Sequence, residues 1–217
     1  MKHIVAINAS PRTDWNTSML VREAAKGAES EGAEVKVYDL YRLEKFTGCI
    51  SCFGCKLREH KGQCVYQDGL SDVLKQIRNS DGLIIGTPNY LGDVTAGFRS
   101  LYERLIFQYI TYKKEIGNYN DRKIPVLFIM TSNVAEEAYA NIGYEQVISR
   151  YKNTLSNVIG PTKVLIYGNT LQVNDYSKYD WTIFNPEEKK VRHEKVLPKK
   201  KNEAFLIGAD MIKNPVV

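Results

Sequence analysis

The feature that most constrains the fold is a repeated alternation of short apolar runs with stretches of helical spacing. Five apolar runs are expected to be strands, at residues 4–7, 35–38, 82–86, 124–130 and 164–167. Helical spacing is found at residues 19–28, 70–77, 95–106, 144–159 and 203–213. The third run is apolar throughout, as expected when helices cover both faces of a sheet. The pattern predicts a parallel, doubly wound α/β domain.

Length, hydropathy and charge favour a single cytoplasmic domain over a membrane, secreted or nucleic-acid-binding protein. A chain of 217 residues with 43% hydrophobic residues suits one large domain. No apolar run is long enough to span a bilayer, and the first residues lack the features of a signal peptide. We therefore expect a cytoplasmic protein whose thiols stay reduced. The net charge of +5 is mild, and many basic residues fall in the polar segment 174–200, which we expect to be irregular. We expect solvated charge there, without nucleic-acid or membrane binding.

Residues 8–18, Asn-Ala-Ser-Pro-Arg-Thr-Asp-Trp-Asn-Thr-Ser, lead from the first strand into the first helix. The loop is rich in hydroxyl and amide groups, and free backbone N–H groups at a helix start bind phosphate readily. The glycine spacings of a Walker A loop and of a dinucleotide-binding loop are absent, so a terminal monophosphate suits the loop better. The structural alternative is an ordinary turn whose hydroxyl groups cap the helix.

Residues 87–93, Thr-Pro-Asn-Tyr-Leu-Gly-Asp, follow the third strand and precede another helix. In such folds, ligands bind outside the carboxyl ends of the strands, where the strand order reverses. Pro88 stiffens this loop, Gly92 permits an unusual backbone angle, and Tyr90 offers a flat face. Successive backbone N–H groups there would suit the edge of a flavin ring. A purely structural turn is the alternative.

Together the two loops resemble the signatures of the NAD(P)H-dependent FMN reductase family. Residues 8–18 resemble its G-S-P-R-x-x-x-N-T phosphate loop, although Ala9 stands where the family usually has Gly. Residues 87–104 resemble its (S/T)-P-x-Y-x-G-x-(V/M)-(T/S) signature and the helix that follows, which ends in D-R or E-R. The resemblance covers roughly residues 1–170. It implies a flavodoxin-like fold, with five parallel strands in the order 2-1-3-4-5.

The resemblance also implies a division of the chain and a set of FMN contacts. A flavodoxin-like domain would span residues 1–173, with a cysteine loop at 47–66, and residues 174–217 would form a C-terminal extension with a closing helix. The implied phosphate contacts are Ser10, Arg12, Asn16, Thr17 and Ser18. The residues implied to border the isoalloxazine ring are Pro88, Asn89, Tyr90, Leu91 and Gly92. A third, less sharply matched contact loop is Thr131, Ser132 and Asn133. The resemblance identifies no catalytic acid or base.

All four cysteines of the chain are Cys49, Cys52, Cys55 and Cys64. The iron–sulfur flavoproteins, one branch of the family, have a compact C-x2-C-x2-C motif followed by a fourth cysteine. This chain is similar in position and in the first two spacings, whereas the eight residues before Cys64 make a slightly longer third gap. The resemblance implies a 4Fe-4S cluster. Zinc and unligated thiols are alternatives, and disulfides are disfavoured in a reducing compartment.

The resemblance implies an FMN-dependent oxidoreductase. Electrons would pass from NAD(P)H or ferredoxin through FMN, with or without the cluster, to a quinone, a flavin or another small acceptor. A non-catalytic flavin electron carrier or redox sensor is the first alternative, and a zinc-stabilised binding protein is the second. Members of the family usually pair, so we expect a homo-oligomer, either a dimer or a tetramer.

Overall fold

A parallel sheet forms the centre of the computed structural model, which describes residues 1–115 and 117–214. Its strands are β1 (His3–Asn8), β2 (Glu34–Asp39), β3 (Gly82–Pro88), β4 (Val126–Thr131) and β5 (Thr162–Tyr167). All four neighbouring pairs are parallel, in the order β2-β1-β3-β4-β5. The predicted doubly wound sheet and its strand order are confirmed.

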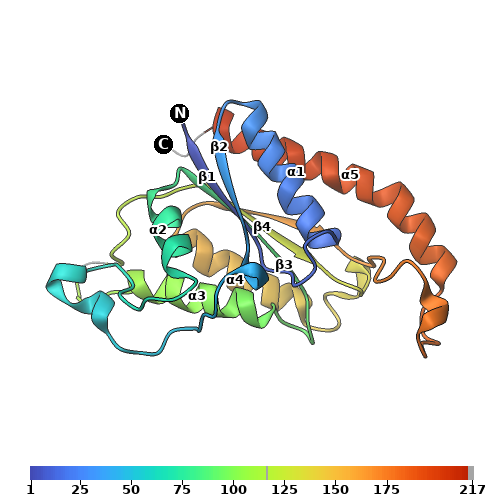
Figure 1. Cartoon of the computed structure of the whole chain (residues 1–217), viewed down its shortest axis with the longest axis horizontal. Coiled ribbons are helices and arrows are strands. Elements are labelled where there is room, and N and C mark those ends of the chain that lie inside the picture. Colours follow the sequence, from blue (N-terminus) through green and yellow to red (C-terminus); the bar gives the residue numbers. More distant parts are fainter. Residues whose placement is uncertain (116, 215–217) are drawn as a thin grey trace.

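Helices cover both faces of the sheet (Figure 1). One face carries α1 (Asn16–Ser30) and α5 (Pro186–Lys213), and the other carries α2 (Ser71–Asn79), α3 (Ala96–Tyr109) and α4 (Tyr144–Val158). Alternate residues of each strand belong to the two resulting cores. In β1, Ile4 packs on the side of α1, whereas Val5 packs on the side of α3. Residues 82–87 of β3 are buried without interruption, which explains the unbroken apolar run.

Local chemistry sets where several elements begin. The expected cap of α3 is confirmed, because the Thr95 side chain accepts a hydrogen bond from the Phe98 N–H at 3.2 Å. The fourth strand begins at Val126, two residues later than expected, directly after Pro125, which has no N–H to donate to a ladder. Helix α1 begins at Asn16, three residues earlier than expected. Polar residues of the predicted loop therefore form its first turn.

The expectation that residues 174–200 are irregular is wrong for the second half of that segment. Helix α5 runs without a break from Pro186 to Lys213, with Pro198 inside it. The N-terminus of α5 has two known helix-start signals. The Asn185 side chain accepts hydrogen bonds from two backbone N–H groups, and a proline occupies the first helical position. Lys189, expected among solvated charges, is buried.

Two glycines bring α1 and α5 into backbone contact. A Cβ atom added to Gly27 would lie 2.0 Å from the Phe205 carbonyl oxygen, and one added to Gly208 would lie 1.9 Å from that of Ala24. Helix α5 is therefore a packed part of the layer on this face. Among the described residues, no helix has both the length and the apolar character needed to cross a bilayer.

Candidate functional site

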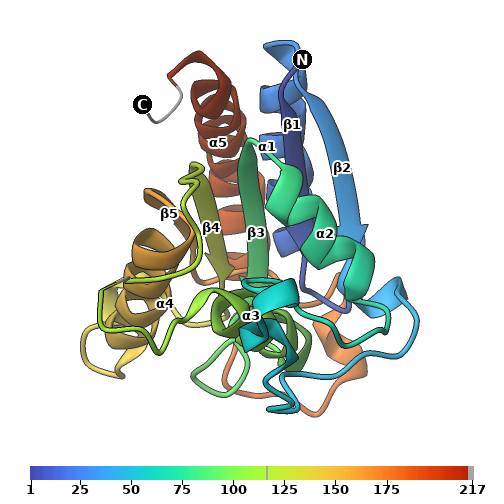
Figure 2. The same ribbon diagram turned by 90° about the vertical axis from the view of Figure 1, so that its left-hand side faces the viewer.

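The loops before α1 and α3 are joined at the carboxyl edge of the sheet, which is the lower end of the molecule in Figure 2. The Thr95 hydroxyl donates a hydrogen bond to the Ala9 carbonyl at 2.7 Å. The Ala9 N–H in turn donates to the carbonyl of Gly86 in β3 at 2.8 Å. The two loops expected to hold a flavin are thus brought together, and they lie where the strand order reverses.

Hydrogen bonds inside the β1–α1 loop fix its path. The Ser10 N–H donates to Asn8 Oδ1 at 3.1 Å, and the Arg12 N–H donates to Ser10 Oγ at 3.1 Å. The Asn8 amide is itself held, because it donates to Asp39 Oδ1 at 2.8 Å. Arg12 is exposed, and its guanidinium lies 4.2 Å from the centre of the Trp15 ring. The loop is therefore ordered by its own contacts, with one cation at its rim.

The first turn of α1 is buried and lacks a side-chain cap. Asn16, Thr17 and Ser18 are all buried. The side chain of Trp15, at the cap position, forms no hydrogen bond with the first backbone N–H groups of the helix. The first backbone N–H groups of a helix have no partner within the helix, so they are free to bind an anion. Asn16 Nδ2 donates to the Leu171 carbonyl at 2.8 Å, whereas Asn16 Oδ1 is buried without a partner among the described residues. The free N–H groups could donate to a phosphate, and the adjacent Asn16 Oδ1 could accept from a hydroxyl group. FMN carries both of these groups.

The β3–α3 loop forms a tighter turn than expected. The Tyr90 N–H donates to the Asp93 carbonyl at 2.7 Å, and the Asp93 N–H donates back to Tyr90 at 3.1 Å. Between them, Leu91 and Gly92 have φ angles of 53° and 87°, as in a mirror-image two-residue turn. Asn89 Oδ1 accepts from the Gly92 N–H at 3.1 Å. The expected row of free donors is not formed here, and the exposed Tyr90 ring and Leu91 at the tip remain available to a ligand.

The third expected contact loop is partly committed to the framework. Thr131 Oγ1 lies 2.7 Å from Thr17 Oγ1, which brings the end of β4 against the first turn of α1. The Ser132 hydroxyl lies 2.5 Å from the Tyr139 hydroxyl, and burial raises the pKa of Tyr139 to about 12. The structure thus places Thr131 beside the phosphate loop. The Ser132 hydroxyl is instead occupied by hydrogen bonds with the Val134 carbonyl and the Tyr139 hydroxyl.

A buried lysine that the sequence analysis missed supports this third loop. Lys189 Nζ donates to the Asn133 carbonyl at 3.0 Å, to Asn133 Oδ1 at 2.7 Å and to Asn169 Oδ1. Burial, with a further contribution from Arg192, lowers the pKa of Lys189 to about 8. The amine therefore fastens the loops after β4 and β5 to α5. The cap and proline at residues 185 and 186 are the sequence signals that could have revealed this helix.

The four cysteines line a single cavity beside α3. Arg104, Phe107 and Gln108 also line it. Cys55 is buried and Cys52 is exposed, and all four thiols are free. Ser51 and Phe53, which stand between cysteines, both have a φ of 56°. These two left-handed residues turn the chain at short intervals, an arrangement often found at functional sites.

The four cysteines of this cavity are the type of donor that binds iron–sulfur clusters. Burial raises the pKa of the Cys55 thiol, Lys56 opposes that effect, and the nearby Cys64 and Cys49 add to it. No group of three or more His, Cys, Asp or Glu side chains within residues 1–115 and 117–214 is spaced to hold a metal ion. A cubane cluster places a different iron at each thiolate, so four sulfurs around one cavity are the donors it requires.

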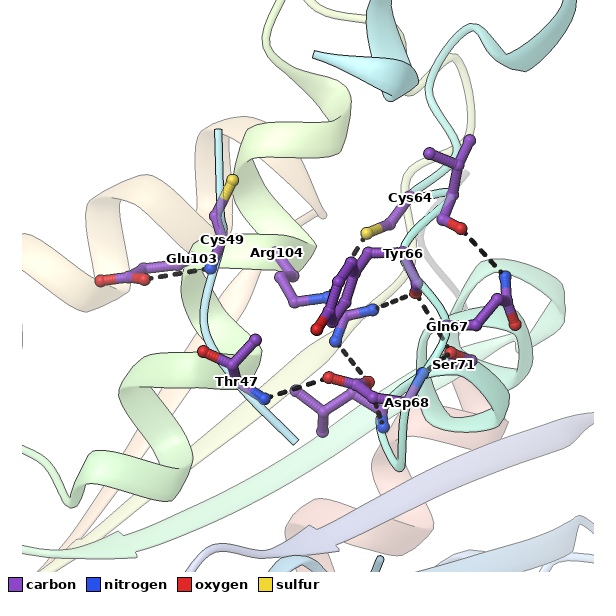
Figure 3. A network of polar contacts seen from close by, with 11 residues as sticks. Thr47, Cys49, Cys64, Tyr66, Gln67, Asp68, Ser71, Glu103 and Arg104 are labelled. Carbon is purple, nitrogen blue, oxygen red and sulfur yellow. Dashed lines mark hydrogen bonds and ion pairs between the residues drawn. The ribbon is translucent and has the colours of Figure 1, made fainter. Parts of the chain in front are cut away.

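Helix α3 supplies the polar wall of the cysteine cavity (Figure 3). Arg104 Nε donates to Cys64 Sγ at 3.4 Å, and its other nitrogens contact Asp68 Oδ1 at 2.5 Å and the Tyr66 carbonyl at 2.6 Å. Burial alone would raise the pKa of Asp68, but the hydrogen bond from Arg104 holds it below its usual value. Gln108 Oε1 accepts from the Cys64 N–H at 3.0 Å. The sequence analysis identified neither α3 side chain.

Helix α3 also relates the two candidate sites in space. It starts directly after the β3–α3 loop at Ala96, and its later turns form the wall of the cysteine cavity. At 1.5 Å per residue, the axis advances about 12 Å from Ala96 to Arg104. The flavin loops and the cysteines therefore lie at successive levels of one helix.

Comparisons with known proteins identify relatives of this chain and structures of the same fold. An iron-sulfur flavoprotein of Methanocaldococcus jannaschii is 35% identical over 101 residues, which is 46% of this chain and 50% of that protein. The chain thus spans about half the length of this curated relative. The NAD(P)H:quinone oxidoreductase from Methanothermobacter marburgensis has the same fold, with a TM-score of 0.66, 14% identity, and coverage of 97% of this chain and 96% of that one.

An FMN-dependent NADH-azoreductase from Bacillus anthracis, solved in complex with FMN, also shares the fold. Its TM-score is 0.61 at 13% identity, over 97% of this chain and 99% of that one. A family model described as NADPH-dependent FMN reductase matches residues 2–145, which include both flavin loops and the cysteine cavity. Because this match covers about two thirds of the sequence, the chain belongs to the NADPH-dependent FMN reductase family.

Proposed function

We propose that the chain is an FMN-dependent oxidoreductase. Electrons enter from NAD(P)H or ferredoxin, pass through bound FMN, and leave to a quinone, a flavin or another small acceptor. The observation that carries this proposal is the buried, uncapped first turn of α1, joined through Thr95 and Ala9 to the turn that holds Tyr90. Family membership supports it, as do the quinone and FMN named for proteins of the same fold.

The residues have distinct parts in this proposal. The N–H groups of the first α1 turn, with the Ser10 hydroxyl and the exposed Arg12, hold the phosphate. The Ser18 hydroxyl instead donates to the Thr13 carbonyl and accepts from Arg22 Nε at 3.2 Å, so it orders the loop. The open Asn16 Oδ1 accepts a hydroxyl group of the ribityl chain. Tyr90 and Leu91 border the ring, with Pro88, Asn89 and Gly92 setting the turn. When bound, FMN supplies the redox chemistry, and the protein supplies position and electrostatics.

The second part of the proposal is a 4Fe-4S cluster held by Cys49, Cys52, Cys55 and Cys64. Support comes from the single cavity that all four line and from relatives named iron-sulfur flavoproteins. Arg104 at this cavity offsets part of the negative charge of four thiolates. Iron and acid-labile sulfide in equal amounts, measured after anaerobic reconstitution, test this part. Zinc without sulfide contradicts it.

The flavin site is tested by FMN affinity. In Ser10→Ala/Arg12→Ala, loss of charge-assisted hydrogen bonds worth about 1.5–3 kcal/mol each should weaken FMN binding by at least about a hundredfold. Ser30→Ala, which alters a hydroxyl at the far end of α1, is the matched control and should bind FMN normally. Unchanged affinity in the double variant contradicts the phosphate assignment.

Turnover separates the oxidoreductase from a carrier or sensor. The FMN-loaded protein should oxidise NAD(P)H repeatedly when a quinone is present, whereas a carrier would exchange its electrons once. Reduction by ferredoxin but not by either nicotinamide would identify the donor as a protein. We also propose a homo-oligomer, and sedimentation velocity of the FMN-loaded protein tests it, because a monomer contradicts it.

A further inference from the structure

Only one of the two polar atoms of the Gln108 amide has a hydrogen-bond partner among the described residues. Its Oε1 atom accepts a hydrogen bond from the Cys64 N–H, but its Nε2 atom is buried with no partner among the described residues. Buried amide donors are almost always hydrogen-bonded, because leaving water without a new acceptor is unfavourable. The unpaired Nε2 therefore points to an acceptor that the chain itself does not provide.

The surroundings of Gln108 indicate what that acceptor is. Gln108 lines the cavity that all four cysteines line, where Phe53, Phe107 and Val65 provide an apolar wall. It also borders a more polar surface pocket on the side of α2. The oxygen acceptors nearest in sequence on α3, the carbonyls of Phe107 and Gln108, already receive bonds from Lys56. A cluster in this cavity would bring sulfur atoms, and sulfurs of such clusters accept N–H hydrogen bonds.

A second donor lies one helical turn away on α3. Arg104 precedes Gln108 by four residues, so the two side chains project from the same side of the helix. The Arg104 side chain is 1% exposed, and its Nε donates to Cys64 Sγ at 3.4 Å. Asp68 holds the far side of the guanidinium (Figure 3), which fixes the direction of the Nε–H bond.

We propose that Gln108 and Arg104 are paired donors to sulfur that raise the reduction potential of the cluster. This inference rests on the proposed cluster and assigns how the chain tunes it. If the cluster is bound, one electron from an external reductant would add negative charge to its sulfurs without a bond to iron having to form or break. Donors directed at sulfur stabilise that reduced state more than the oxidised state. Removing a donor therefore makes the cluster harder to reduce.

The test is a mediated redox titration of the holoprotein, followed by the electron paramagnetic resonance signal of the reduced cluster. Gln108→Glu keeps the oxygen that accepts from the Cys64 N–H but replaces the donor with a carboxylate. At the wild-type midpoint, its reduced-to-oxidised ratio should fall by at least about tenfold, equivalent to about 59 mV for a one-electron couple. Gln108→Met should shift the ratio in the same direction by less.

Two controls distinguish tuning from other roles. If Gln108 only held the Cys64 backbone, Gln108→Glu would have the wild-type midpoint and Gln108→Met would not, and that result overturns the proposal. Gln67→Glu makes the same chemical change on an exposed side chain of the cysteine segment, and it should shift the midpoint far less. An equal shift in Gln67→Glu would assign the effect to general charge and would also overturn the proposal.

Iron analysis separates this inference from the proposed function. If wild-type protein holds no iron and sulfide after anaerobic reconstitution, the proposed cluster is wrong and this inference falls with it. If all variants hold the cluster with equal midpoints, only the inference is wrong. If both Gln108 variants lose iron while still binding FMN, Gln108 retains the cluster and does not tune it, which also overturns the inference.

Discussion

The β1–α1 loop and the cysteine segment differ in how far the protein alone completes them. In the loop, backbone and side-chain groups of Asn8, Ser10 and Arg12 bond to one another, and the turn that follows is buried. In the cysteine segment, the side chains of Ile50, Phe53 and Leu57 are exposed. Among the four thiols, only that of Cys64 accepts a hydrogen bond from Arg104.

This difference indicates two ways of building a candidate binding site. The flavin loop is rigid before its ligand arrives, so binding there requires little reordering. The cysteine segment contains two left-handed residues and has exposed apolar side chains around its thiols, so the proposed cluster would contribute to its stability. We therefore expect loss of the cluster to loosen residues 47–66 while the flavin loop stays intact.

The largest effect is expected from Cys55→Ser, which removes the buried thiolate of the cavity. Iron content should fall from a full cluster to none, because the hydroxyl of serine is a poor replacement for a thiolate. FMN affinity should not change, since Cys55 belongs to the cavity beside the later turns of α3. Parallel measurements of iron and FMN binding check both claims. A matching loss of FMN would show that the two regions are not independent.

Asp68→Ala tests the support behind the cysteine cavity. The substitution leaves the Arg104 guanidinium buried without its carboxylate, and breaking a buried pair in this way costs about 3–5 kcal/mol. Urea unfolding measures the change in the free energy of unfolding. Glu31→Gln removes a more exposed pair with Lys213 and should cost far less. Equal losses would mean that the Asp68 pair is no more important than a surface contact.

Lys189, which holds the third flavin loop through Asn133, should make the stability of the protein depend on pH. The pKa of Lys189 is about 8 in the folded protein and about 10.4 in an unfolded chain. Between those values the unfolded chain binds more protons, so the free energy of unfolding should rise with pH, by about 3 kcal/mol in total. Lys189→Met should lack that rise, whereas Lys190→Met, at an exposed neighbour, should keep it. A rise that survives in Lys189→Met would contradict the assignment.

The smallest effect is expected from Thr95→Val, at the link between the two flavin loops. Loss of the α3 cap and of the hydrogen bond to the Ala9 carbonyl should destabilise the protein by about 1–2 kcal/mol. FMN affinity should fall severalfold, and iron content should stay the same. Thr154→Val, on an exposed part of α4, is the control and should affect neither stability nor FMN binding. A loss of iron in Thr95→Val would show that the link also supports the cysteine cavity.

The sequence predicted the sheet well because each strand buries its own residues in a recognisable pattern. Strand β3 is apolar along its length because helices cover both of its faces. Helix α5 was predicted only in its second half, since Pro198 normally argues against a helix interior. Here the packing of α5 against α1 outweighs the missing hydrogen bond.

The candidate site was predictable where its chemistry is local. Loop motifs select Ser10 and Tyr90 as candidates for FMN contacts, and the short cysteine spacings select the four thiols as candidate ligands. Arg104, Gln108 and Lys189 were not predictable, because each acquires its role from a segment distant in sequence. In isolation, Arg104 and Gln108 resemble any polar residues of a surface helix. Only the path of the cysteine segment across α3 buries them.

The close backbone approaches at Gly27 and Gly208 have an evolutionary consequence. Neither position can accept even a methyl group unless the two helix axes move apart, because each glycine faces a backbone carbonyl of the other helix. A lineage that replaces one glycine must therefore shift the crossing of α1 and α5, and the same shift would relax the requirement at the other. We expect the two positions to change together among descendants of this protein, and the flavin loop at the start of α1 to move with them.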